Sequence, residues 1–395
     1  MKKTIFLDYA AGTPCDPRAQ QAFLTAAREI GNPSSLHSAG RRAADILYKS
    51  RKDVATFLGA RPGEIFFTGS GSEANNMAVM CVAGAAPDTI RIVATTPIEH
   101  LSLLDPMRSL SEKGFKVQMI HVDRTGRVDF EHIKQLVTPQ TLLVSVIYGS
   151  NEIGTIEPIA KIGNYIREFR RKHNSPYPLF HTDACQAAEY LDMNVQHLGV
   201  DLLSFNSSKI YGPRGVGALY VRQGTPIVPW IRGGHQEQGI RAGTENVPGI
   251  AGFARAVGLI HHARIRRMRA LRDYFITKVQ KQLPDIKING PLGEERLPNN
   301  VHIAVSGMGS EHLLLELDQR GVAVGKGSAC TAHSVEPSHV LRAIGVRAPY
   351  LGGALRFSFG RATTKKDIDT ALDALNASLS TLRNRYGANP RTLKK

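Results

Sequence analysis

Residues 179–209 read LFHTDACQAAEYLDMNVQHLGVDLLSFNSSK, and this stretch decides the fold class. Two short runs that begin with apolar residues, 179–183 and 202–205, are predicted to be buried strands. The first strand ends at Asp183, and the second is followed, after three polar residues, by Lys209. Because ligands of open α/β sheets collect at the carboxyl ends of the strands, we expect both side chains at one binding edge.

The same pattern continues outward from this stretch. Five more apolar runs are predicted to be strands: 65–68, 91–95, 116–121, 142–148 and 216–221. Helical periodicity fills most of the intervals, for example 74–83 and 159–172. The alternation predicts an α/β fold with a seven-stranded, mostly parallel sheet. The turn before 216–221 is too short for a helix, so this strand is expected to be antiparallel and to lie at the end of the sheet.

A smaller α+β domain is predicted in the last third of the chain. A long helix is expected from Pro248 to Lys281, where Pro284 stops it. Beyond it, the predicted strands are 301–305, 322–324 and 355–359, and the predicted helices are 310–319, 337–344 and 366–382. We therefore predict a large domain over 14–258 and a small domain formed by 1–13 and 259–395.

The composition excludes several classes of protein. The chain has 395 residues, of which 42% are hydrophobic and 21% charged, which is globular rather than disordered or fibrous. No run approaches the roughly 18 uninterrupted apolar residues of a membrane span. Lys2 and Lys3 imitate the start of a signal peptide, but Asp8 ends the apolar stretch that follows them. These features predict a cytoplasmic protein that does not span a membrane.

The cysteines and the charge each leave alternatives open. Cys15, Cys81, Cys185 and Cys330 are far apart with no CxxC pair, which disfavours a disulfide framework and a thiolate-bound structural metal. The formal net charge is +16, and most of it falls in 264–287 and 361–395. These stretches are either solvated helix faces with a solubilising tail, or an electrostatic footprint for an acidic protein or RNA.

A glycine-rich turn, Gly69-Ser70-Gly71-Ser72-Glu73, links a predicted strand to a predicted helix. Exposed backbone N–H groups and the helix dipole at such a turn favour an anion such as phosphate. Ser70 and Glu73 have the spacing of a capping box. The turn is therefore either a phosphate site or an ordinary capped helix start.

Asp183 and Lys209 also have two interpretations. A carboxylate that keeps a pyridine nitrogen protonated and a lysine that forms a Schiff base are the groups that pyridoxal 5′-phosphate (PLP) requires. The alternative is a structural ion pair. His100 and Asn151 follow two other predicted strands, so an imidazole and a carboxamide are expected at the same edge.

Cys330 lies in GKGSACTAHS, residues 325–334, among small and polar residues. Lys326 and His333 make this an electropositive setting in which a thiol can ionise and react. Cys330 is therefore either a nucleophile or an incidental loop cysteine. The other three cysteines are expected in or near the core.

Together these segments resemble the cysteine desulfurase family, PLP enzymes of fold type I, and within it the NifS/IscS-like subgroup. The resemblance runs from residue 6 to about residue 364. Its motifs, in order, are FLDYAA (6–11), GNPSSLH (31–37), NEIGT (151–155), HTD (181–183), KIYGP (209–213), RAGTEN (241–246), GSACT (327–331) and LRFSFGR (355–361). Several motifs in one order are far more specific than any single one.

The resemblance implies a PLP site formed by Gly71, Ser72, His100, Asn151, Asp183, Gln186, Asn206, Ser208, Lys209 and Thr244. In that site Lys209 binds PLP covalently, Asp183 pairs with the ring nitrogen, and Gln186 contacts the phenolic oxygen. His100 stacks on the ring and assists proton movement. Thr244 reaches the phosphate from the other subunit of a homodimer.

Two positions depart from the family pattern in the phosphate-binding set of Gly71, Ser72, Asn206 and Ser208. Asn206 stands where the family usually has Ser, and Ser208 where it has His. Both side chains can still donate a hydrogen bond to phosphate. Because Ser208 is shorter than an imidazole, its contact with phosphate is the less certain of the two.

The family's activity converts L-cysteine to L-alanine. Asn151 and Arg356 are expected to bind the substrate carboxylate, and the freed Lys209 amine to remove the Cα proton. The Cys330 thiolate then attacks the substrate sulfur and carries it as a persulfide to an acceptor. The subgroup implies an iron–sulfur scaffold or a tRNA-thiolation enzyme as that acceptor, with Cys330 as a possible transient iron–sulfur ligand and no other metal.

Three alternatives to a desulfurase remain. A PLP aminotransferase or a selenocysteine lyase would use the same PLP site, although an aminotransferase has no use for Cys330. A basic sulfur-delivery or RNA-binding scaffold without turnover would account for the net charge of +16. Binding of nucleic acid is left open.

Overall fold

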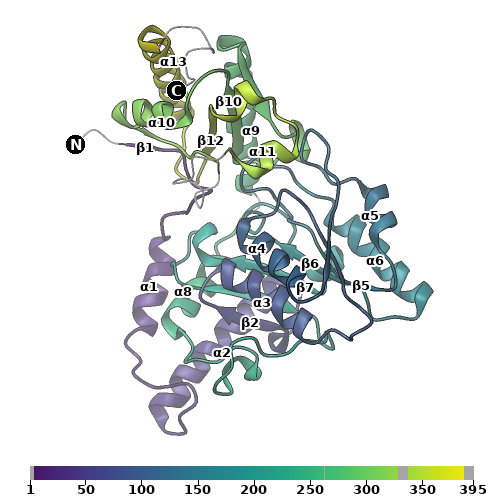
Figure 1. Cartoon of the computed structure of the whole chain (residues 1–395). Coiled ribbons are helices and arrows are strands. Elements are labelled where there is room, and N and C mark those ends of the chain that lie inside the picture. Colours follow the sequence, from purple (N-terminus) through teal and green to yellow (C-terminus); the bar gives the residue numbers. More distant parts are fainter. Residues whose placement is uncertain (1–3, 262, 328–336, 387–395) are drawn as a thin grey trace.

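The computed structural model describes residues 4–261, 263–327 and 337–386. A seven-stranded sheet forms the centre of the larger unit (Figure 1). From one edge to the other its strands are β2 (Ile65–Thr68), β8 (Gly217–Val221), β7 (Leu202–Asn206), β6 (Leu179–Asp183), β5 (Thr141–Ser145), β3 (Ile92–Thr95) and β4 (Lys116–Met119). The pairs from β7 to β4 are all parallel, and only β8 runs against its neighbours. The predicted α/β class and mostly parallel sheet are confirmed.

The predicted place of β8 was wrong. The strand is antiparallel, as expected, but it lies between β7 and β2 rather than at the end of the sheet. Every residue of β8 is buried, so the strand needs a hydrogen-bonded neighbour on each side. β2, an early strand in the sequence, returns to pair with it through Ile65–Tyr220 and Thr68–Gly217 and becomes the edge strand.

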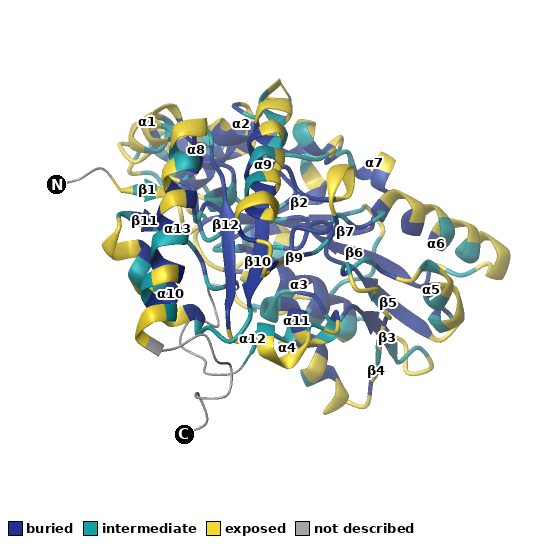
Figure 2. Ribbon diagram, turned by 90° about the horizontal axis from the view of Figure 1, so that it is seen from above, coloured by how far each residue is buried: buried dark blue, intermediate teal, exposed yellow. Residues whose placement is uncertain are grey.

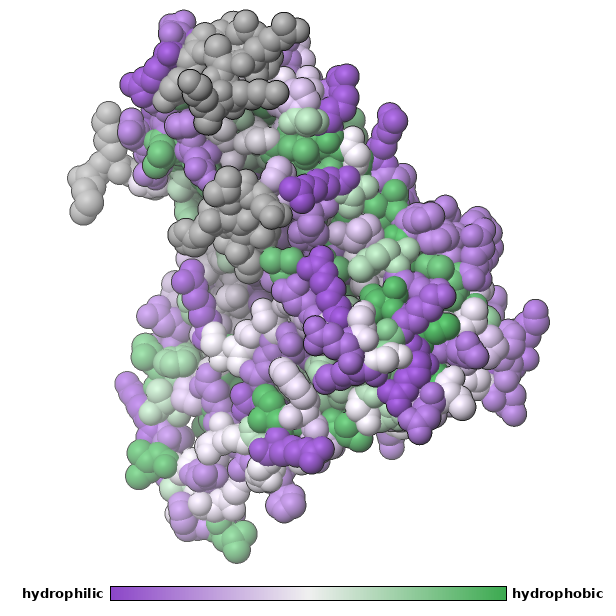
Figure 3. Space-filling model, viewed as in Figure 1, coloured by the Kyte–Doolittle hydropathy of each residue, from purple (hydrophilic) through white to green (hydrophobic). Residues whose placement is uncertain are grey.

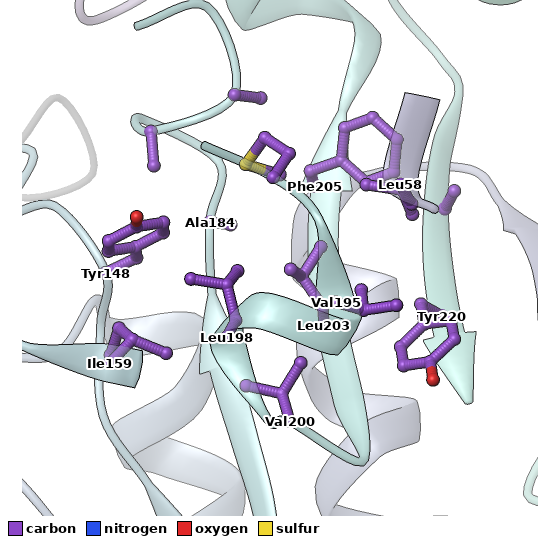
Figure 4. Close-up of a cluster of buried hydrophobic side chains, with 14 of the residues drawn as sticks. Leu58, Tyr148, Ile159, Ala184, Val195, Leu198, Val200, Leu203, Phe205 and Tyr220 are labelled. Atoms are coloured by element: carbon purple, nitrogen blue, oxygen red, sulfur yellow. The ribbon is translucent and has the colours of Figure 1, made fainter. Parts of the chain in front are cut away.

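Helices cover both faces of this sheet (Figures 1 and 2). They are α1 (Pro17–Ala26), α2 (Ser38–Leu58), α3 (Gly71–Gly84), α4 (Leu101–Ser111), α5 (Phe130–Leu136), α6 (Ile159–His173), α7 (Val195–Leu198) and α8 (Val247–Val257). One hydrophobic cluster joins the sheet to α2, α6, α7 and α8, and includes Leu203 and Phe205 of β7 (Figure 4). A second cluster joins α3 and α4 to the other face.

The smaller unit holds two further sheets. β9 (Ile286–Asn289), β10 (Asn300–Val305) and β12 (Ala354–Ser358) form an antiparallel sheet with β10 in the middle, and β1 (Ile5–Phe6) pairs in parallel with β11 (Val322–Ala323). Its helices are α9 (Ala263–Gln282), α10 (Ser310–Gln319), α11 (His339–Ala343), α12 (Ala348–Leu351) and α13 (Lys365–Tyr386). Short 3-10 turns occupy Pro62–Glu64, Ser207–Lys209, Gln236–Gly239 and Gly293–Glu295.

The predicted single helix from Pro248 to Lys281 was wrong, because two helices, α8 and α9, occupy this range. α8 ends at Val257, and Gly258 follows as its C-cap. Glycine has a low helix propensity, about 1 kcal/mol less favourable than alanine, so a break is favoured there. The strands β1 and β9 were not predicted: β1 has only two residues, and β9 was missed although its four residues alternate between apolar and polar. The division into 14–258 and 1–13 with 259–395 remains a proposal.

The N-terminal segment connects the two units. Leu7 is fully buried in the core of the smaller unit, and the Ala10 N–H donates to Ser358 Oγ of β12 at 2.8 Å. A few residues later the Thr13 N–H donates to the Ser208 carbonyl at 2.9 Å. This path holds the carbonyl groups of Ala10 and Ala11 beside Lys209.

Most of the visible surface is hydrophilic, and its hydrophobic side chains form small separate patches (Figure 3). Within the described ranges no helix has both the length and the apolar character needed to cross a bilayer. The basic stretch on α9 is not entirely a solvated face, because Arg272 is fully buried and donates to the Arg296 carbonyl at 2.7 Å. Cys81 is buried, whereas Cys15 and Cys185 are half-buried.

Glu157, just before α6, is a buried carboxyl group that predicts how stability changes with pH. Burial, partly offset by a hydrogen bond from the Val128 N–H at 3.1 Å, raises the pKa of Glu157 to about 8. Between the usual glutamate pKa and pH 8 the folded chain therefore keeps a proton that the unfolded chain releases. Stability is lost as pH rises through this window, by an amount on the order of a few kcal/mol.

We expect Glu157→Gln to remove this loss, because glutamine keeps an acceptor for the Val128 N–H and has no charge to bury. The gain in melting temperature of the variant over the unchanged protein should be larger at pH 9 than at pH 5, which thermal unfolding at the two pH values measures. A difference that does not change with pH would show that the Glu157 carboxyl group is not protonated in the folded state.

Candidate active site

One cavity lies at the carboxyl ends of β6 and β7, where the sequence placed the binding edge. Ten of the predicted site residues line it: Gly71, Ser72, His100, Asn151, Asp183, Gln186, Asn206, Ser208, Lys209 and Arg356. They come from α3, from the start of α4, from the ends of two parallel strands and from β12 of the smaller unit. The cavity therefore joins residues far apart in the chain, such as Gly71 and Arg356, which are 285 positions apart.

Asp183 ends β6 and is 4% exposed. Its Oδ2 accepts from Asn75 Nδ2 at 2.7 Å, and its Oδ1 accepts from the Cys185 N–H at 2.9 Å. The arrangement presents a fixed negative charge to the cavity and suits a cationic or protonated partner.

Lys209 ends the 3-10 turn that follows β7. Its Nζ donates to the Ala10 carbonyl at 2.7 Å and to the Ala11 carbonyl at 2.8 Å. These two contacts hold the amine at the N-terminal segment, inside the cavity. The N-terminal segment thus orients the one lysine among the residues that line the cavity.

The glycine-rich turn forms another part of the cavity. Ser70 caps α3 by accepting from the Glu73 N–H at 3.1 Å, but Glu73 reaches back to the Gly69 N–H rather than to Ser70. A Cβ at Gly71 would lie 2.7 Å from Cys185 Sγ and 3.0 Å from Asn206 Nδ2, so only glycine fits there. Asn206 Oδ1 is buried without a hydrogen-bond partner. The start of α3 and Asn206 form a polar cradle at a helix N-terminus, which favours an anion.

Arg356 enters the cavity from β12 and is 1% exposed. Its Nη2 donates to Asp8 Oδ1 and its Nη1 to the Asn151 carbonyl, both at 2.8 Å. Its Nε is buried without a partner. A buried guanidinium with a free donor is suited to a carboxylate ligand.

Among the described residues, one predicted site residue, Thr244, is not brought into this cavity. Thr244 lies in a separate pocket with Gly69, Glu237 and Arg241, where Arg241 pairs with Glu73 at 2.7 Å. Its predicted contact with phosphate crosses to a second copy of the chain and stays a prediction. Cys330 lies outside the described residues.

The cavity also contains residues that the sequence analysis missed. Asn75, Ser102 and Cys185 line it, together with the backbone of Ala10 and Ala11. Asn75 and Ser102 are ordinary residues in predicted helices, and no local pattern separates them from surface amides and hydroxyls. The position of Cys185, two residues after Asp183 at a strand end, was a sign that it could have been included.

Cys185 is a thiol of a different kind from the one expected at Cys330. Burial, together with the nearby Asp183 carboxylate, raises the pKa of the Cys185 thiol well above its usual value. A protonated thiol is a poor nucleophile. Cys185 is therefore a packing neighbour of Gly71 rather than a reactive group.

The chain is similar to known proteins over nearly its whole length. Residues 5–371 match the model of the family described as aminotransferase class-V. The chain is 43% identical over 387 residues to the cysteine desulfurase IscS of Dictyoglomus turgidum, covering 97% of this chain and 96% of that protein. Among solved structures it is similar to a NifS-like protein with a TM-score of 0.88 and 35% identity, covering 96% of this chain and all of the other. A structure of SspA in complex with cysteine has a TM-score of 0.77 and 30% identity, and the match covers 90% of this chain and 98% of the SspA chain.

Proposed function

The chain belongs to the aminotransferase class-V family and, within it, to the cysteine desulfurases, and we propose that it uses PLP to move sulfur from L-cysteine onto Cys330. The observation that carries this proposal is the meeting of Asp183, Lys209 and Arg356 in one cavity. An acid at a strand end, a lysine and a buried arginine together match an amino-acid substrate and a pyridine cofactor. Neither the substrate nor the cofactor alone would require all three side chains.

The residues of the cavity fit PLP. The Asp183 carboxylate, held by two hydrogen bonds, suits a protonated pyridine nitrogen. The polar cradle at Gly71 and Asn206 suits a phosphate, to which the Asn206 amide would donate through Nδ2. Lys209 Nζ is the amine that would hold the cofactor. PLP would supply an electron sink for negative charge at the substrate Cα.

The other roles follow from the same geometry. Arg356 would bind the substrate carboxylate through its free Nε and its remaining hydrogens, with Asn151 beside it. This contact fixes which substrate atoms face Lys209, because the carboxylate and the amino group are joined at Cα. Lys209 would then take the Cα proton, since the Ala10 and Ala11 carbonyls keep its amine in the cavity.

Sulfur transfer belongs to Cys330 in this proposal. Its thiolate attacks the substrate sulfur, the carbon–sulfur bond breaks, and the two electrons of that bond stay on the alanine fragment, which takes up a proton. The sulfur then remains on Cys330 as a persulfide for an acceptor protein. An iron–sulfur scaffold and a tRNA-thiolation enzyme are the acceptors that the family resemblance suggests, and a homodimer would bring Thr244 to the phosphate.

The function is tested by the products from L-cysteine. We expect the PLP-loaded protein with a thiol reductant to give alanine and sulfide in equal amounts, measured by amino-acid analysis and a sulfide assay. A keto acid in place of alanine would identify an aminotransferase instead. Turnover of selenocysteine but not of cysteine would identify a selenocysteine lyase.

A further inference from the structure

A hydrogen-bonded chain of side chains connects His100 with Asp183. His100 is the N-cap of α4, and its Nδ1 lies 2.7 Å from Ser102 Oγ. Asn75 Nδ2, on α3, donates to Ser102 Oγ at 2.9 Å and to Asp183 Oδ2 at 2.7 Å. The amide of Asn75 is thus the link between two side chains to which the proposed function gives roles.

The Asn75 amide has one orientation that fits its neighbours. An Asn75 amide turned the other way would place its oxygen against the Asp183 carboxylate, so Nδ2 must face that group. Nδ2 then uses one hydrogen on Asp183 and the other on Ser102 Oγ. The Ser102 oxygen accepts from Asn75 and keeps its own hydrogen, which it can donate to His100 Nδ1 at 2.7 Å.

A backbone hydrogen bond identifies His100 Nδ1 as an acceptor. The Ser102 N–H also donates to His100 Nδ1, at 3.1 Å. Because Nδ1 accepts from the Ser102 N–H, a neutral imidazole carries its proton on Nε2, and the Ser102 hydroxyl is then the donor in its contact with Nδ1. The ring therefore offers Nε2–H as a hydrogen-bond donor.

The buried Asn75 amide makes this hydrogen-bonded chain of side chains unfavourable for the free energy of folding. Asn75 is 1% exposed, and its Oδ1 is buried without a hydrogen-bond partner. A buried amide with an unsatisfied oxygen is destabilising by about 1–3 kcal/mol, so an apolar residue would suit the packing of α3 against α4 better. The amide is thus better explained by what its nitrogen orients than by stability.

We propose that Asn75 and Ser102 are positioning residues that fix the orientation and the tautomer of His100 and tie both to the Asp183 carboxylate. This inference rests on the proposed function for the roles of His100 and Asp183. Asn75 sets the Ser102 hydroxyl, the hydroxyl sets Nδ1, and the ring is left with its proton on Nε2. Asp183 is thereby connected to the imidazole through two side chains.

The chain offers a matched control in the next residue of α3. Asn76 Nδ2 donates to the Ser102 carbonyl at 3.1 Å and to the Ser72 carbonyl at 2.9 Å. Asn76→Ala therefore weakens the attachment of α3 to α4 at the same residue without touching the Ser102 hydroxyl. Ser102→Thr keeps a hydroxyl at this position, whereas Ser102→Ala removes it.

The test is the ¹⁵N spectrum of the cofactor-free protein labelled in its histidines, with the His100 signals assigned by their loss in His100→Gln. We expect Asn75→Ala and Ser102→Ala to move the His100 Nδ1 signal, and Asn76→Ala and Ser102→Thr to leave it in place. In the PLP-loaded protein, kcat should fall on the order of tenfold in each of the first two variants, the loss of one hydrogen bond. The double variant should lose no more than either alone.

An equal shift of the Nδ1 signal in Asn76→Ala would overturn the proposal, because the effect would then come from helix packing. Unchanged Nδ1 signals in Asn75→Ala and Ser102→Ala would overturn it as well, as would additive losses in the double variant. The spectrum needs neither PLP nor turnover. A protein that fails to desulfurate cysteine but shows the expected shifts would therefore refute the proposed function and keep this inference.

Discussion

Lys209→Ala is expected to give a folded protein that stays colourless with PLP and makes no alanine from L-cysteine. The variant removes the only lysine amine among the residues that line the cavity, and with it both the covalent hold on PLP and the base for the Cα proton. We expect activity to fall by at least about a thousandfold, since positioned acid–base groups contribute roughly 10²–10⁴. Absorbance with added PLP and an alanine assay measure the two losses.

Lys161→Ala is the control for this variant. Lys161 is an exposed lysine on α6 that lies 4.1 Å from the centre of the Phe130 ring, outside the cavity. The Lys161→Ala protein should turn yellow with PLP and release alanine as the unchanged protein does. If Lys209→Ala turned yellow with PLP and released alanine at the rate of the Lys161→Ala protein, the assignment of Lys209 would be wrong.

Cys330→Ser is expected to separate cofactor binding from sulfur transfer. The variant should bind PLP and turn yellow, because Asp183, Lys209 and the cradle at Gly71 remain. It should change its absorbance when L-cysteine is added, yet release no sulfide, because a serine hydroxyl at neutral pH cannot replace a thiolate as the nucleophile. Absorbance titration and a sulfide assay test the two halves.

Two other cysteines serve as comparisons for that experiment. Cys15 is half-buried, and burial followed by the charge of Asp16 raises the pKa of its thiol, so Cys15→Ser should release sulfide normally. Cys81 is buried in the core and its pKa is raised to about 11. Normal sulfide release by Cys330→Ser would show that the sulfur leaves by another route.

The parts of the fold with a local pattern were predictable. β2 and β6 have the predicted bounds, and α10 spans Ser310–Gln319 as expected, because short apolar runs and helical periodicity are properties of neighbouring residues. The order of strands depends on pairing across long stretches of sequence, so the interior position of β8 was not visible. The break between α8 and α9 rests on one glycine within an otherwise helical pattern.

The candidate site was predictable wherever a chemical group stands at a strand end. Asp183 and Lys209 have this property, and the structure places both in one cavity. Asn75 and Ser102 do not, because their significance comes from hydrogen bonds between two helices that meet only in the folded chain. The same holds for Asp8, whose contact with Arg356 joins the two ends of the sequence.

The central claim is that sulfur from L-cysteine passes through Cys330 with Lys209 as the amine of the PLP site. The most direct test is mass analysis of the peptide that contains Cys330, after the PLP-loaded protein has reacted with L-cysteine and its thiols have been alkylated without reduction. The account predicts that this peptide gains the mass of one sulfur atom, with one alanine released for each, and that Lys209→Ala shows neither. Alanine formed in equal amount while the added sulfur is found on Cys185, or on no cysteine, would contradict it.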